Sequence, residues 1–123
     1  MKIYLASSWK MRACVLRIAK ELRAAGHEVD AFCDEETRLC FNWDELAEIM
    51  ENEGLDRSKL NACDMMQHWR VRGAFYEDKK MLDWADAVVM IMPCGRSAHM
   101  EAGYAAGAGK KTVYCRRVRT GRI

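Results

Sequence analysis

Two acidic residues stand inside otherwise apolar helical patterns. The first is Asp78, which falls in a predicted helix over residues 73–84 and is the only polar member of one helical face. That face consists of Ala74, Phe75, Asp78, Met81 and Leu82. A carboxylate on such a face needs partners, because burial without them is costly or forces protonation. Asp78 is therefore a candidate catalytic residue, and the alternative is an acid that caps a neighbouring backbone amide.

The second acid is Glu101, the only acidic residue after Asp86. It falls on a predicted helix over residues 97–108 that otherwise consists of small, apolar and neutral side chains. With Ser97 as the N-cap, Glu101 lies one position past the capping-box site, so its carboxylate is not needed to close the helix. Backbone amides and the helix dipole should favour its ionised form. The pattern indicates either a catalytic carboxylate or an acid that stabilises a helix start.

A strand-to-helix turn between these acids has the composition of an anion-binding site. Gly95, Arg96 and Ser97 supply backbone amides, a guanidinium and a hydroxyl. Ser7 and Ser8 follow the first predicted strand in the same way, and turns at the ends of neighbouring parallel strands lie side by side. The two turns predict a ligand pocket, although every α/β protein has turns of this kind.

Aromatic residues flank these segments. Trp9 follows the first strand, and Phe41 and Trp43 precede a central helix, so each is a candidate for stacking on a nucleobase or for packing in the core. His68 and His99 have no ligand-like spacing to other histidines or to cysteines. We therefore expect no metal site and no cofactor.

Strands and helices alternate along the chain. Apolar runs predict strands over residues 2–6, 28–32, 87–92 and 112–115, and helical spacing predicts helices over about 15–22 (ended by Gly26), 43–50, 60–69, 73–84 and 97–108. This order predicts an α/β fold with three α/β/α layers and a small, mostly parallel sheet, doubly wound in the flavodoxin-like or Rossmann-like manner. Asp78 and Glu101 should then face one crevice at the carboxyl ends of the first and third strands, with residues 7–9 as a wall.

The composition is that of one globular domain. The 123 residues are 50% hydrophobic and 31% charged. We assign residues 1–115 to a single domain and residues 116–123 to a basic tail with four arginines. Because the net charge is +2, the rest of the chain carries 2 − 4 = −2. A nucleic acid partner is therefore not expected, since the body has no basic surface.

Cysteine usage points to a reducing compartment. The six cysteines form no C-x-x-C pair, and three lie in apolar periodic segments, as reduced and buried thiols do. The sequence shows no secretory signal pattern, and no apolar run approaches the ~20 residues needed to cross a bilayer. We expect a cytoplasmic protein with no membrane partner.

Two stretches of the sequence resemble the nucleoside 2-deoxyribosyltransferase family, which includes the deoxynucleoside monophosphate N-glycosidases. The more specific stretch runs from Trp84 to Val88 and then from Pro93 to Tyr104. The opening residues, from Ile3 to Trp9, look like the first strand and nucleoside-binding loop of that family. Residues 34–66 match poorly.

The resemblance implies a double displacement at a sugar carbon. Glu101 matches the glutamate that attacks the anomeric carbon and holds the sugar as a glycosyl-enzyme ester. Asp78 stands eight residues before Asp86, as does the family's aspartate that assists at the base. Transferases of the family pass the sugar to another base and hydrolases pass it to water, and the sequence leaves both open.

The resemblance also bears on substrate and assembly. Phosphate-specific relatives carry serine and arginine near these strand ends, where this chain has Ser7, Ser8, Arg96 and Ser97. Relatives continue beyond the strand at 112–115, so we expect a homodimer in which a partner subunit covers the pocket and the sheet edge. The alternative to an enzyme is a noncatalytic nucleotide-binding or sensing module on the same fold.

Overall fold

The computed structural model describes residues 1–38, 40, 43–59 and 61–116. The order of elements begins with β1 (Lys2–Ala6), a 3₁₀ turn (Trp9–Met11), α1 (Arg12–Ala24) and β2 (Glu28–Ala31). An arm of helices follows, with α2 (Trp43–Asn52), a second 3₁₀ turn (Arg57–Lys59), α3 (Ala62–Gln67) and α4 (Trp69–Trp84). The chain then returns through β3 (Ala87–Met92), α5 (Arg96–Gly107) and β4 (Lys111–Arg116).

All four strands of the sheet are parallel, in the order β2-β1-β3-β4. In the register, Tyr4 of β1 lies between Asp30 of β2 and Val88 of β3. This order agrees with the flavodoxin-like doubly wound arrangement. The chain passes from β1 to β2 on one side of the sheet and then crosses to β3 on the other side of β1. The strand order therefore reverses between β1 and β3, and ligands of open α/β sheets bind at such a point.

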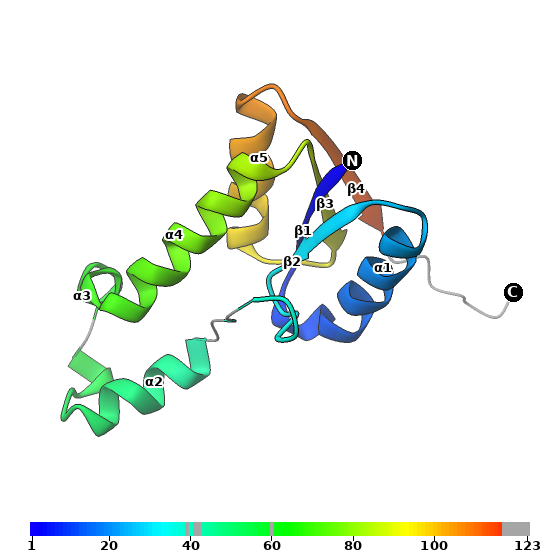
Figure 1. Ribbon diagram of the computed structural model, residues 1–123. Helices are drawn as coiled ribbons and strands as arrows, with labels where there is room; N and C mark the ends of the chain where they lie inside the picture. Colours follow the sequence, from blue (N-terminus) through cyan, green and yellow to red (C-terminus); the bar gives the residue numbers. More distant parts are fainter. Residues whose placement is uncertain (39, 41–42, 60, 117–123) are drawn as a thin grey trace, which may run out of the picture.

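Helices cover both faces of the sheet (Figure 1). On one face, Ile3 and Leu5 of β1 pack against Val15 and Ala19 of α1. On the other face, Tyr4 and Ala6 of β1 and Val88 and Met90 of β3 join a cluster with helix residues Leu82, Ala98, Ala102 and Ala105. Since β1 and β3 are apolar on both sides, they are central strands of a three-layer α/β/α fold, as the sequence predicts.

The helices α2 and α3 and the first half of α4 extend away from the sheet (Figure 1). This arm has a small core of its own, formed by Leu46, Met50 and Val71. The second half of α4 is anchored to the body, because Leu82 is buried and Lys110 Nζ donates hydrogen bonds of 2.6–2.7 Å to the carbonyls of Leu82, Asp83 and Ala85. Asp78 therefore lies where α4 leaves the body.

Several predicted boundaries were wrong. The helix α4 begins at Trp69 and runs through Gly73, because His68 caps its first turn by accepting a hydrogen bond from the amide of Arg70. The helix predicted over 60–69 is the shorter α3. The helical pattern places Phe75 on a core face, but its side chain is 60% exposed. The left-handed Gly26 that ends α1 is confirmed, with a φ of 93°.

The remaining predictions about the chain have mixed outcomes. Cys33 is buried, Cys63 is exposed, and the other four cysteines are half-buried. The predicted burial of the thiols therefore holds fully only for Cys33. The last strand includes Arg116, which the sequence pattern assigns to the tail. Phe41 and tail residues 117–123 lie outside the described residues.

Candidate active site

The two catalytic and six substrate-binding residues predicted from the sequence all line one cavity of about 340 Å³. They are Ser7, Ser8, Trp9, Asp78, Gly95, Arg96, Ser97 and Glu101. The cavity lies at the carboxyl ends of β1 and β3, and its volume falls within the range of roughly 300–1,000 Å³ usual for small-molecule sites. Both carboxylates thus open onto one crevice, and the turn that follows β1 forms part of its wall.

Glu101 reaches the cavity from α5 and accepts a hydrogen bond from the hydroxyl of Tyr4. Tyr4 lies on β1 and is fully buried. Burial, with a smaller contribution from Asp78, raises the pKa of Glu101 to about 7, while the Tyr4 hydrogen bond and Arg38 oppose the rise. Burial also raises the pKa of Tyr4, so Tyr4 stays neutral and remains a hydrogen-bond donor.

The predicted start of α5 was wrong, and so was the expectation that the helix dipole keeps Glu101 ionised. The N-cap is Gly95, Arg96 is the first helical residue, and Ser97 does not cap the helix. Glu101 is then the sixth residue of α5, beyond the first turn where the helix dipole acts. Burial therefore outweighs the helix dipole, and Glu101 titrates near neutrality rather than staying fully ionised.

Asp78 belongs to a buried ion-pair network that also contains Arg38 and Asp30. Arg38 Nη2 lies 2.7 Å from Asp78 Oδ1, and Arg38 Nη1 lies 3.0 Å from Asp30 Oδ2. The side chains of Arg38 and Asp30 are each 6% exposed, whereas that of Asp78 is 38% exposed because it faces the cavity. The suggestion that Asp78 caps a backbone amide is thus replaced by an ion pair with an arginine.

The network balances burial against charge. Burial raises the pKa of Asp78 and of Asp30, and Arg38 lowers both. For Arg38 itself, burial lowers the pKa, but Asp30 and Asp78 more than compensate, so its pKa is raised and it stays charged. Three carboxylates, those of Asp30, Asp78 and Glu101, thus interact with one guanidinium.

The turns at the strand ends contribute polar groups of different kinds. Ser7 Oγ is buried and donates a 2.9 Å hydrogen bond to the carbonyl of Ile91, so it ties the end of β1 to β3. Ser8 and Gly95 are extended N-cap residues without a side-chain cap. The first amides of α5, with Arg96 and Ser97, therefore line the cavity at a helix N-terminus, where anions are favoured.

The remaining wall of the cavity is apolar. Phe32 contacts Trp9 edge to face, with ring centroids 5.6 Å apart and planes at 86°. From the arm, Met66, Val71 and Phe75 line the same cavity. A planar aromatic ligand in this cavity would meet these apolar side chains as well as the two carboxylates. Of the other two stacking candidates, Trp43 is the first residue of α2, and Phe41 lies outside the described residues.

The two histidines considered above have structural contacts. His68 Nε2 lies 3.0 Å from Glu53 Oε2, and His99 Nδ1 lies 2.7 Å from the carbonyl of Gly95. Within residues 1–116, where the structure describes them, no group of three His, Cys, Asp or Glu side chains is arranged to hold a metal ion. No helix in the same part of the chain is long and apolar enough to cross a membrane.

Tyr4 and Arg38 are site residues that the sequence interpretation missed. Tyr4 falls in an apolar strand, and its hydroxyl is the available signal, because a buried tyrosine hydroxyl usually has a partner. Arg38 stands in an irregular segment without periodicity. No local pattern there indicates that its side chain turns back to the sheet.

Comparison with solved structures supports the fold. No family model and no curated protein matches the chain. Among solved structures, the chain is similar to a 2-deoxyribosyltransferase from Bacillus psychrosaccharolyticus, with 22% sequence identity and a TM-score of 0.62. The match covers 100% of this chain and 76% of the other. The fold is therefore that of a 2-deoxyribosyltransferase structure, the same group of proteins that the sequence motifs resemble.

Proposed function

We propose that this protein is an enzyme that breaks the N-glycosidic bond of a nucleoside or nucleoside 5′-monophosphate and transfers the sugar to another base or to water. The observation that carries the proposal is the meeting of Glu101 and Asp78 in one cavity at the point where the strand order reverses. The likeness to a 2-deoxyribosyltransferase structure supports a 2-deoxyribosyl substrate.

The proposed reaction has two displacements. In the first, a carboxylate oxygen of Glu101 forms a bond to C1 of the sugar while the C1–N bond breaks and its electron pair leaves with the base. Asp78 assists at the departing base by donating a proton to it. In the second, a base nitrogen or a water oxygen bonds to C1, the ester bond to Glu101 breaks, and the proton of the incoming group returns to Asp78.

The surroundings of Glu101 suit this role. A nucleophile must be ionised, and a pKa of about 7 leaves a substantial ionised fraction at neutral pH. The Tyr4 hydroxyl donates to the carboxylate and fixes its orientation. Burial weakens the hydration that would otherwise reduce its reactivity.

A 5′-phosphate would fit beside the turns that follow β1 and β3. Ser8, Gly95, Arg96 and Ser97 line the cavity, and the N-cap of α5 is a glycine, which has no side chain to cap the first amides of the helix. Helix N-termini with a nearby arginine bind phosphate through amides and guanidinium together. Ser7 contributes less, because its hydroxyl hydrogen is committed to Ile91.

The test is an assay of base release. The protein is incubated with purine and pyrimidine 2′-deoxynucleosides, ribonucleosides and their monophosphates, with and without a second free base, and the products are separated by chromatography. Release of base that requires Glu101 supports the enzyme, and exchange between bases separates transfer from hydrolysis. Binding of these compounds without any release of base would instead favour the noncatalytic nucleotide-binding module.

We also propose a cytoplasmic homodimer. All six cysteines are free, as in reducing compartments. Large apolar side chains are exposed on α4 and α5, among them Trp69, Tyr76 and Met100, and a partner subunit would cover them. Sedimentation at micromolar concentration should give the mass of a dimer, and a monomer would contradict this assembly.

A further inference from the structure

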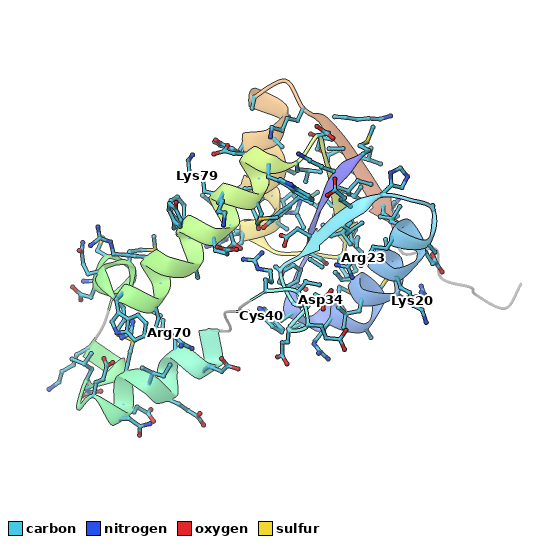
Figure 2. The ribbon with its side chains drawn as sticks, viewed as in Figure 1. Lys20, Arg23, Asp34, Cys40, Arg70 and Lys79 are labelled. Atoms are coloured by element: carbon cyan, nitrogen blue, oxygen red, sulfur yellow. The ribbon has the colours of Figure 1, made fainter. Side chains whose placement is uncertain are left out.

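Arg38 comes from a turn that is held in place independently of the cavity. After β2, the amides of Thr37 and Arg38 donate to the carbonyl of Asp34, and its carboxylate accepts from the amide of Glu36. The other oxygen of that carboxylate forms a 2.9 Å ion pair with Arg23 of α1, and Figure 2 shows the two side chains close together beside the sheet. The turn is thus tied to α1.

The guanidinium of Arg38 connects this fixed turn to α4. One nitrogen binds Asp30 on β2, whose backbone is in register with Tyr4 of β1. The other binds Asp78 at the place where α4 leaves the body. Because the planar guanidinium fork fixes both carboxylates at once, the position of Asp78 is defined relative to the sheet that also carries Tyr4.

The contact with Arg38 uses only one carboxylate oxygen of Asp78. Oδ1 accepts the hydrogen bond from Arg38, and the side chain is 38% exposed to the cavity. Among the described residues the second oxygen has no hydrogen-bond donor, and Asp78 lines the cavity, so this oxygen is available to a ligand there. Asp78 lies where the arm leaves the sheet. Without the contact to Arg38, the side chain of Asp78 could adopt other rotamers.

We infer that Arg38 is a positioning residue, which holds Asp78 against the sheet through Asp30 and so presents one oxygen of Asp78 to the base of the substrate. The inference rests on the proposed function, since it assigns the role of Arg38 in that reaction. Arg38 also lines the cavity, but its two terminal nitrogens are already bound to Asp30 and Asp78, so we assign its effect to the placement of Asp78 rather than to substrate binding. Its positive charge also opposes the effect of burial on the pKa of both acids.

Charged and titratable groups reach this network from every neighbouring element. Those that act on Asp78 or share its cavity are Tyr4 of β1, Asp30 of β2, Arg38 of the turn, Glu77 of α4, and Arg96 and Glu101 of α5. Three of them are carboxylic acids, and Arg38 lowers the pKa of both Asp78 and Glu101, so removing its charge should make ionisation of these two acids harder.

Three variants test the inference. Arg38→Lys keeps the charge but loses the two-pronged contact. The double variant Arg38→Met with Asp30→Asn removes the cation without leaving Asp30 as an unpaired buried charge, so it should still fold. Lys79→Met is the matched control, because Lys79 forms a 2.8 Å ion pair with Asp83 on the same helix but points away from the sheet (Figure 2).

The expected result is a loss of kcat without a loss of substrate binding. Arg38→Lys should lower kcat by ~10-fold with an unchanged pH profile, because the charge remains. The double variant should lower kcat by ~100-fold and leave KM within ~3-fold. The acidic limb of its profile should move up only slightly, because the loss of Asp30 offsets part of the effect that the loss of Arg38 has on the pKa of Glu101. Lys79→Met should match the wild type.

Two results would overturn the inference while the proposed function stands. One is a double variant as active as the wild type, and the other is a raised KM with unchanged kcat, which would mean that Arg38 binds substrate. If the wild type releases no base from any substrate, the proposed function fails instead. A carbon-13 NMR titration of the aspartate carboxyls tests the contact between Arg38 and Asp78 independently of activity, because its loss in the double variant must raise the pKa of Asp78 and an unchanged value contradicts the inference.

Discussion

The hydroxyl of Tyr4 donates a hydrogen bond to the carboxylate of Glu101, which joins the first strand of the sheet to the helix that follows the third strand. The contact spans 97 positions of sequence. It stabilises the ionised form of a carboxylate whose burial favours the neutral form. Together these effects give Glu101 a pKa of about 7, so the ionised fraction of this nucleophile changes with pH around neutrality.

Replacing Tyr4 by phenylalanine should therefore shift the pH dependence of activity. Without the hydrogen bond the pKa of Glu101 rises, so the acidic limb of kcat/KM should move up by roughly one pH unit. Activity should be recovered in part at alkaline pH, where Glu101 ionises again. The matched control is Tyr104→Phe, which removes a 2.6 Å hydrogen bond to Asp83 outside the cavity. Identical pH profiles for Tyr4→Phe and the wild type would contradict this account.

Glu101 should also lower the stability of the fold at neutral and alkaline pH. Its pKa rises from an ordinary value of 4.5 to about 7 in the folded chain, so the folded state holds the proton more tightly than the unfolded state does. The stability that a neutral Glu101 contributes is complete below pH 4.5 and is lost as the pH rises through 7. For this shift the loss amounts to about 3 kcal/mol.

The measurement is chemical denaturation of the wild type and Glu101→Gln at several pH values. Because glutamine does not ionise, the variant should exceed the wild type by about 3 kcal/mol in the free energy of unfolding at alkaline pH. The two proteins should be about equally stable under acidic conditions, where Glu101 is protonated in both states. A difference between them that does not change with pH would show that burial does not destabilise the ionised Glu101.

Asp78→Asn should reduce activity because the departing base loses the group that assists it. The change keeps the shape of the side chain but removes its charge and its ability to exchange a proton, so kcat should fall by ~10² to 10⁴-fold. The loss should be smallest for substrates whose base leaves without protonation. Asp83→Asn, further along α4 and outside the cavity, serves as the control. Equal losses for every leaving base would remove Asp78 from this role.

Much of the fold was predictable because its signals are local. Apolar runs mark β1 and β3, and Gly26 marks the end of α1 with a positive φ. Alternation of strands and helices then leaves few topologies for a parallel sheet. The candidate residues at the strand ends converge on one cavity for the same reason, because their places follow from the topology.

What could not be predicted depends on contacts that no periodic pattern records. The pairing of Arg38 with Asp30 and Asp78 joins a turn, a strand and a helix that are distant in sequence. The start of α4 was missed because Gly73 suggests a break in the helical pattern. Instead, the side chain of His68 caps the helix, which begins at Trp69 and continues through the glycine.

The central claim is that Glu101 forms a covalent bond to the sugar, and trapping this intermediate tests it most directly. The protein is incubated with a 2-fluoro sugar analogue of a cleaved nucleoside, which slows the breakdown of the glycosyl-enzyme, and is then digested and analysed by mass spectrometry. The account predicts one added glycosyl unit on a peptide containing Glu101, and none in Glu101→Gln, whose cleavage should be at least ~10³-fold slower. A sugar trapped on another residue, or full activity in Glu101→Gln, would contradict it.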